Sequence, residues 1–153
     1  MELPPGLLHV IGQTHLFTDG VDYVILSIPA TQIQEVLRLL DKVPGPFTAW
    51  LWDKDELTLV LPVATWELSR PTLEIAEESP LYRLITFDLP LELGLTGYVA
   101  TLIGKIAEQG VSVFLLSAFA RDHVLVPVED FDRAWEALRS FIRDCRAQEI
   151  LSD

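Results

Sequence analysis

The sequence is poor in the side chains that hold metals and drive redox chemistry. It has a single cysteine, Cys145, so the chain forms no internal disulfide and Cys145 has no thiol partner for a metal or redox site. Its three histidines are scattered, and no two of them stand at the spacing that binds a metal from one helix. We therefore predict no metal and no cofactor.

Motifs of nucleophilic catalysis and nucleotide binding are also missing. The sequence contains no G-x-S-x-G elbow and no Walker loop. His123 follows Asp122, which suggests a base with an orienting carboxylate, but neighbours in a strand point to opposite faces of a sheet. We expect no catalytic residues and no enzymatic activity.

Positive charge is scarce. The chain has 11 lysines and arginines against 23 acidic residues, a net charge of −12. Phosphate backbones need clustered lysine and arginine, so the composition argues against nucleic acid and against anionic membrane surfaces. Arg139, Arg143 and Arg146, with Asp144 and Glu149, are interpreted as a solvated face of the last helix.

Long apolar runs are absent as well. No run reaches the roughly 20 residues of a membrane span. The N-terminal segment, residues 1–6, lacks the basic start of a secretory signal. These two features predict a soluble cytoplasmic protein.

Half of the residues are hydrophobic, enough to build a core in one ordinary domain or two very small ones. Apolar spacing predicts, in the first half, a strand, a helix and two further strands at residues 23–28, 31–42, 47–52 and 57–61. In the second half it predicts a strand, a helix, two strands and a helix at residues 82–89, 97–109, 111–116, 124–128 and 129–143. Gly110 is placed to cap the first of these two helices in the left-handed conformation.

The two halves form a weak internal repeat, in which residues 57–63 align with residues 122–128. Each half follows the order β-α-β-β, and residues 64–80 between them read as a linker or an irregular crossover. This order predicts an α+β fold of two ferredoxin-like modules, with antiparallel sheets and helices on one face. We place the modules at residues 1–70 and 71–153 and expect them to pack as one pseudo-symmetric unit, because about 60 residues give a marginal core.

A candidate binding site combines a glycine-bearing loop with a turn. The loop, residues 91–97, joins a strand to a helix whose free N–H groups suit a carboxylate. The turn, residues 117–122, offers Asp122 for an ammonium group and Phe119 for an aliphatic side chain. The alternative is that the glycines only shape the loop and Asp122 only caps the turn.

The second half resembles the ACT domain, in particular the subgroup found in the CASTOR arginine sensors and in small tandem-ACT proteins. The similarity covers residues 82–141 and is carried by the segments 87–89, 95–97, 110–114 and 117–126. Ala118 departs from the pattern, since threonine is usual there. The first half matches only in its order of elements.

This resemblance implies βαββαβ modules of ACT type that bind free amino acids at an interface between two such modules, without catalysis. Carried onto the matching positions, the ligand-binding residues are Leu95, Thr96, Gly97, Ser117, Ala118, Phe119 and Asp122. The implied function is that of a small-molecule-binding regulatory or sensor protein, whose partners are a free amino acid or similar small molecule and a second copy of the chain or a regulated protein. The alternative is a protein–protein interaction module that binds no ligand and uses ACT-like sheet pairing.

Overall fold

The computed structural model describes residues 3–43, 45, 47–92 and 94–152. Leu93 of the predicted loop, and Met1 and Glu2 of the N-terminal segment, lie outside these ranges. Contacts group the chain into two compact units, a continuous unit, Asp19–Arg83, and a two-segment unit, Met1–Thr18 with Leu84–Asp153. This grouping differs from the division into 1–70 and 71–153, which stays a prediction as a domain boundary.

The continuous unit contains an antiparallel sheet built around β2 (Asp22–Pro29). β2 pairs with β4 (Glu56–Pro62), in a register that runs from Tyr23 opposite Pro62 to Pro29 opposite Glu56. β3 (Ala49–Trp52) pairs with the other edge of β4, and β5 (Glu77–Glu78) pairs with the other edge of β2. The resulting order β5-β2-β4-β3 is that of a ferredoxin-like βαββαβ module.

Two helices pack on this sheet, α2 (Ile33–Leu40) and α3 (Val63–Ser69), each beside a 3-10 turn, η1 (Ala30–Gln32) and η2 (Arg70–Thr72). Alternate residues of β2 and β4 meet them in a core with Val36 and Trp66. Residues 64–80 are therefore neither the predicted linker nor an irregular crossover, since they contain most of α3, the turn η2 and the strand β5. The apolar signal of this segment is short because α3 spans seven residues and buries only Trp66 and Ser69.

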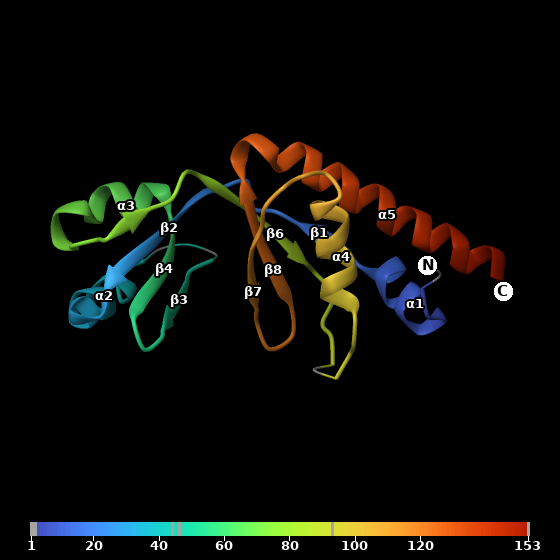
Figure 1. Cartoon of the computed structure of the whole chain (residues 1–153), viewed down its shortest axis with the longest axis horizontal. Helices are drawn as coiled ribbons and strands as arrows, with labels where there is room; N and C mark the ends of the chain where they lie inside the picture. Colours follow the sequence, from blue (N-terminus) through green and yellow to red (C-terminus); the bar gives the residue numbers. More distant parts are fainter. Residues whose placement is uncertain (1–2, 44, 46, 93, 153) are drawn as a thin grey trace. The chain divides into compact units, whose positions relative to one another are not determined.

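The two-segment unit contains β6 (Tyr82–Phe87), α4 (Tyr98–Ala107), β7 (Phe114–Ser117), β8 (Asp122–Pro127), η3 (Val128–Asp130) and α5 (Phe131–Ser152) (Figure 1). The first two residues of β6, Tyr82 and Arg83, belong by contact to the continuous unit and pair with β2. β8 lies between β6 and β7, and pairs with β7 in antiparallel fashion. Gly110 is left-handed (φ 71°) and its N–H donates to the carbonyl of Ala107 at 2.9 Å, which confirms the predicted cap.

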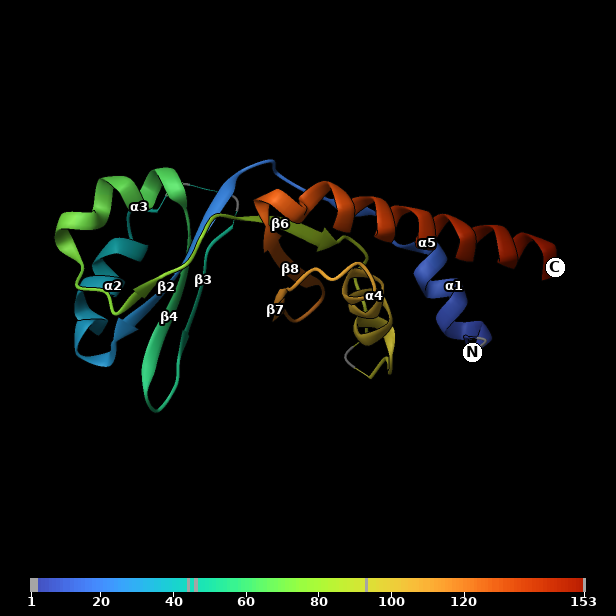
Figure 2. The same ribbon diagram turned by 45° about the horizontal axis from the view of Figure 1, so that its top comes forward.

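The N-terminal segment completes the two-segment unit, a role that the sequence did not reveal. β1 (Leu16–Phe17) pairs with β6, with Leu16 opposite Phe87 and Phe17 opposite Thr86. β1 thus lies beside β6, the first long strand of its unit, as β5 lies beside β2 in the continuous unit. α1 (Pro5–Gln13) packs along α5, and both views show the two helices side by side (Figures 1 and 2).

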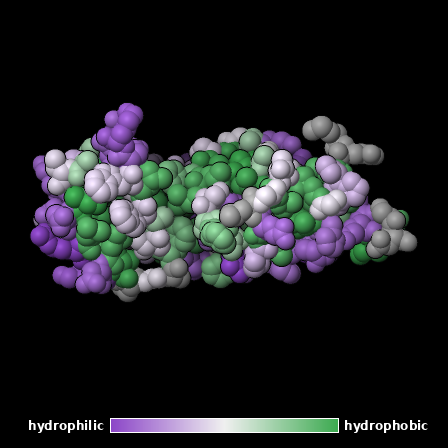
Figure 3. All heavy atoms as spheres, turned by 90° about the horizontal axis from the view of Figure 1, so that it is seen from below, coloured by the Kyte–Doolittle hydropathy of each residue, from purple (hydrophilic) through white to green (hydrophobic). Residues whose placement is uncertain are grey.

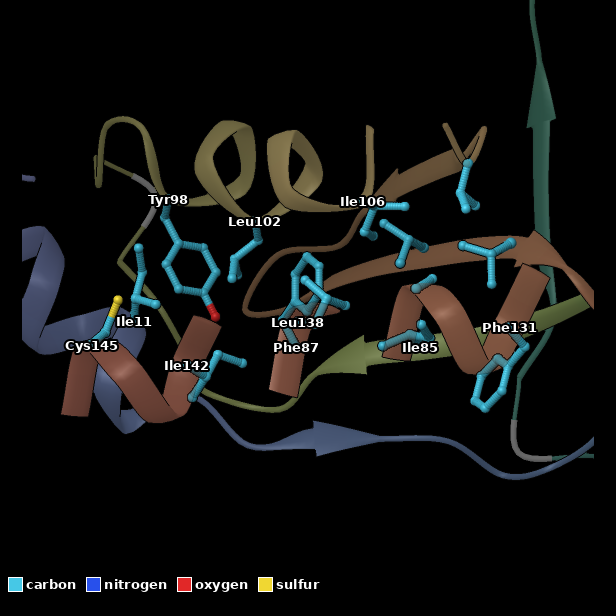
Figure 4. Close-up of a cluster of buried hydrophobic side chains, with 14 of the residues drawn as sticks. Ile11, Ile85, Phe87, Tyr98, Leu102, Ile106, Phe131, Leu138, Ile142 and Cys145 are labelled. Atoms are coloured by element: carbon cyan, nitrogen blue, oxygen red, sulfur yellow. The ribbon is translucent and has the colours of Figure 1, made fainter. Parts of the chain in front are cut away.

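The core of the two-segment unit lies between its helices and its sheet (Figure 4). α4 directs Tyr98, Leu102 and Ile106 toward Phe87 of β6 and Leu138 of α5. The Phe87 and Tyr98 rings meet edge to face, with centroids 6.2 Å apart at 87°. Their apolar area and ring geometry both stabilise the packing of α4 on the sheet.

The predicted fold class is confirmed, since each unit combines antiparallel strands with packed helices. One predicted strand begins later than expected: the prediction was 111–116, and β7 spans Phe114–Ser117. No helix within the described ranges combines the length and apolar character needed to cross a bilayer. Hydrophobic and hydrophilic residues lie side by side on the face in Figure 3.

Candidate functional site

The predicted loop and the predicted turn lie against each other in the two-segment unit. The N–H of Leu91, at the start of the loop between β6 and α4, donates to the carbonyl of Ala120 at 2.9 Å. The turn between β7 and β8 is closed by the N–H of Ala118, which donates to the carbonyl of Arg121 at 2.9 Å, and by the pairing of Ser117 with Asp122.

An ion pair anchors the turn to the end of β6. The Arg121 Nε donates to a carboxylate oxygen of Asp88 at 2.7 Å. The N–H of Asp88 in turn donates to the carbonyl of His15 at 2.7 Å, just before β1. Both groups are partly exposed, so the pair contributes little stability and serves mainly to orient the turn.

A pocket of about 220 Å³ lies between the loop and the turn. It is lined by residues from three places, the loop, the first turn of α4 and the β7–β8 turn: Leu91, Glu92, Leu95, Tyr98, Val99, Ser117, Ala118, Phe119, Ala120, Arg121 and Asp122. Its size suits a ligand smaller than the drug-sized molecules that fill pockets of about 300–1,000 Å³.

Five of the seven predicted ligand-binding residues line this pocket, namely Leu95, Ser117, Ala118, Phe119 and Asp122. Thr96 and Gly97 do not. Gly97 precedes α4 in the left-handed conformation (φ 88°), and its carbonyl accepts a hydrogen bond from the Thr101 hydroxyl at 2.7 Å. This backbone conformation, which residues with a side chain rarely adopt, is how Gly97 shapes the entry to the helix; the nearest atom to a Cβ there is Leu7 Cδ2, at 3.4 Å.

Four further lining residues belong to the predicted loop and turn without having been predicted as ligand contacts: Leu91, Glu92, Ala120 and Arg121. The sequence reasoning missed Tyr98 and Val99, which lie outside both segments. Tyr98 and Val99 are the first residues of α4, so the argument from the helix N-terminus pointed one residue too early. Gly97 itself indicated this boundary, because a glycine in the left-handed conformation precedes the helix and the first helical N–H groups belong to the residues after it.

The pocket is acidic. Glu92 and Asp122 contribute two carboxylates, whereas its one cationic side chain, Arg121, is engaged by Asp88 outside the lining. Within the ranges that the structure describes, no hydrogen bond or ion pair joins the Asp122 carboxylate to another side chain. A cationic group on a ligand would therefore meet uncompensated negative charge at Asp122.

The negative charge of Asp122 affects the pKa of the neighbouring Tyr98. The pKa of Tyr98 is raised to about 12, mainly by burial; the hydrogen bond to Thr14 lowers it and the nearby Asp122 carboxylate raises it. The Tyr98 hydroxyl and the Thr14 hydroxyl are 2.8 Å apart. The tyrosine thus stays neutral, fixed by the N-terminal segment on one side and lining the pocket on the other.

His123 turns away from Asp122, as strand geometry predicts. Its Nδ1 lies 2.8 Å from the hydroxyl of Thr86 on β6. Burial lowers the pKa of His123, with opposing effects of Asp122, which raises it, and Arg121, which lowers it.

A second, wider pocket of about 530 Å³ adjoins the first and shares Leu91, Glu92 and Leu95 with it. Its other lining residues come from α1 and the loop: His9, Val10, Gln13, Leu89, Pro90 and Gly94. Nowhere in the described part of the chain do three His, Cys, Asp or Glu side chains gather to hold a metal ion.

Comparison with known proteins agrees with this architecture. Residues 77–140 match the family model of the ACT domain. The sequence matches no curated protein.

Several solved structures are similar to the chain. One is a protein of unknown function and possible transport protein from Vibrio cholerae, 26% identical over 90% of this chain and 96% of that chain, with a TM-score of 0.71. A protein from Agobacterium tumefaciens is 20% identical over 84% and 88%, with a TM-score of 0.61. The regulatory subunit of aspartate kinase from Thermus flavus is 14% identical over 84% and 95%, with a TM-score of 0.60. The chain therefore has an ACT-type α+β fold and carries an ACT domain match over residues 77–140.

Proposed function

We propose that the chain is a regulatory protein, not an enzyme, and that it binds a free amino acid or a similar small molecule in the 220 Å³ pocket. The observation that carries the proposal is the position of Asp122 in one pocket with the first residues of α4. A helix N-terminus attracts a carboxylate through its free N–H groups and its dipole, and Asp122 attracts an ammonium group. The two ends of an amino acid match these two ends of the pocket.

The ACT-type fold supports a regulatory role. A similar fold is found in the regulatory subunit of aspartate kinase from Thermus flavus. We further propose, from the resemblance to the ACT subgroup of the CASTOR sensors, that a second ACT-type module covers the pocket. Phe119, which lines the pocket and is 81% exposed, provides apolar surface for such a cover.

The test is a thermal-shift screen of the full chain with the twenty amino acids at millimolar concentration, followed by calorimetric titration of any hit. A ligand above its dissociation constant must raise the melting temperature. Asp122→Asn should abolish the stabilisation while leaving the unliganded protein folded, because no side-chain partner is lost. Asp41→Asn is the matched control, since Asp41 is an exposed aspartate after α2. Stabilisation that survives in Asp122→Asn would reject the role of Asp122, and no stabilisation by any amino acid would reject the proposal.

The second candidate is an interaction module without a ligand, which the edge strands favour. β3 and β7 end the strand order, and β3 exposes 46% of Trp50, 52% of Leu51 and 59% of Trp52. Exposed apolar side chains on an unpaired edge strand are a template for pairing with another chain. Sedimentation of the wild type and of Leu51→Lys distinguishes the candidates: an assembly that Leu51→Lys disrupts, in a protein that no amino acid stabilises, would favour the second.

A further inference from the structure

A separate pocket of about 340 Å³ lies between the N-terminal segment and α5, inside the two-segment unit. Three arginines from α5 line it together with residues around the start of β1 and one apolar residue of the helix: Thr14, His15, Leu16, Arg139, Ile142, Arg143 and Arg146. It shares no residue with the 220 Å³ pocket.

The charge of this pocket is opposite to that of the chain. The protein has 23 acidic and 11 basic residues, yet three of those 11 line this pocket and no carboxylate does. Arg139, Arg143 and Arg146 follow one another at helical spacings of four and three, so they lie along one stripe of α5. Like charges at these spacings repel, which destabilises a helix unless an anion compensates them.

Other contacts leave most of the guanidinium donors available. Arg146 donates its Nε to the carbonyl of Gly12 at 2.9 Å, which holds its side chain across to α1. Arg143 donates to the Ser140 hydroxyl at 3.1 Å. An arginine has five N–H donors, so each of these contacts leaves several for a ligand.

The nearest carboxylates compensate the stripe weakly. Arg139 lies 3.5 Å from Glu136 and Arg143 lies 3.6 Å from Asp144, and all four side chains are at least 60% exposed. Pairs of this kind contribute little. Glu149, which the sequence suggested as part of a balanced helix surface, contacts His9 instead.

We propose that this pocket binds a small multiply charged anion, of the class of phosphate esters and pyrophosphates. Guanidinium forks bind phosphate oxygens bidentately, and three of them suit a ligand with more than one negative charge. Leu16 and Ile142 offer apolar surface to an organic part of the ligand. The pocket volume lies within the range of about 300–1,000 Å³ that small-molecule sites occupy.

The experiment titrates the 153-residue chain with inorganic phosphate, pyrophosphate and ATP at constant ionic strength, by calorimetry and by NMR of the arginine Nε–H signals. Saturable binding of pyrophosphate or ATP that shifts the signals of Arg139, Arg143 and Arg146 is expected. Arg143→Gln should weaken binding about tenfold, the effect of losing one strong charge-assisted contact. Arg139 and Arg143 are suitable positions because both are exposed, whereas Arg146 also holds α1.

Arg133→Gln is the matched control, since Arg133 lies on the same helix, pairs with Asp130 and does not line the pocket. An equal loss of binding in Arg133→Gln and Arg143→Gln would overturn the proposal, because it would indicate attraction to the whole helix surface. So would the absence of saturable binding at millimolar concentration, or binding to vesicles of anionic lipid without binding to the free anions.

Discussion

At the scale of single residues, Gly97 connects the loop to α4 through its backbone. It is left-handed at φ 88°, a conformation that costs a residue with a side chain roughly 1–2 kcal/mol. Its carbonyl accepts hydrogen bonds from both the N–H and the hydroxyl of Thr101, at 3.0 and 2.7 Å. The orientation of the first turn of α4, and so of Tyr98 and Val99 in the pocket, depends on this residue.

Gly97→Ala is therefore expected to destabilise the protein by about 1–2 kcal/mol and to weaken ligand binding as the first turn shifts. Urea unfolding measures the first effect. Gly104→Ala is the control with the opposite sign: Gly104 lies inside α4 with no atom within 4 Å of a built Cβ, so alanine should stabilise the helix by about 0.5–1 kcal/mol. Equal effects of the two substitutions would contradict the assigned role of Gly97.

His123 makes stability depend on pH. Burial lowers its pKa below the ordinary value of 6.5, so the unfolded chain binds a proton at His123 more readily than the folded protein does. Its contribution to stability is therefore fully present above pH 6.5 and is lost as the pH falls through 6.5 toward the lowered folded value.

The free energy of unfolding should thus fall between about pH 8 and pH 5 by more in the wild type than in His123→Gln. Urea unfolding at a series of pH values measures this difference. Parallel curves for the two proteins would mean that His123 titrates alike in the folded and unfolded states.

At the scale of elements, α1 and β1 are the parts of the two-segment unit that the sequence left unassigned. α1 is nine residues long, and β1 has only two residues. Two residues are too few to show the alternation of a strand, whereas α1 carries Leu7, Leu8 and Ile11 at helical spacing, so the sequence did hold a signal for this helix. Tertiary contacts fix the positions of both elements: Leu7 and Ile11 of α1 pack in the core with Tyr98 and Cys145, and β1 pairs with β6.

Ile11→Ala should destabilise the protein by about 2–5 kcal/mol, because Ile11 is fully buried in the core of the two-segment unit. Hydrogen exchange should report faster exchange in α5 and α4, against which α1 packs. Gln13→Ala, an exposed change in the same helix, serves as the control and is expected to be nearly neutral. Little destabilisation by Ile11→Ala would mean that α1 is not part of the core.

At the scale of the whole molecule, the net charge of −12 governs solubility. The isoelectric point of about 4.5 lies well below neutral pH, where the molecules repel one another. We expect light scattering to show self-association that rises as the pH approaches 4.5 and disappears again at neutral pH. Scattering that is independent of pH would contradict this account.

The sequence by itself determined the α+β class and most of the regular elements. α2, α4 and the strands β2, β4, β6 and β8 were predictable because each buries one face through a run long enough to show its period. The glycine loop and the Asp122 turn were also recognisable as candidate parts of one site, because glycines and the ends of strands can be identified from a few neighbouring residues.

Only the tertiary structure decided which residues meet. It brought Leu91 against Ala120, and it placed Tyr98 and Val99, instead of Thr96 and Gly97, in the pocket lining. It also brought the start of β1 to the arginines of α5, from the opposite end of the chain. Contacts between residues more than a hundred positions apart leave no local pattern, since each partner alone is an ordinary loop or helix residue.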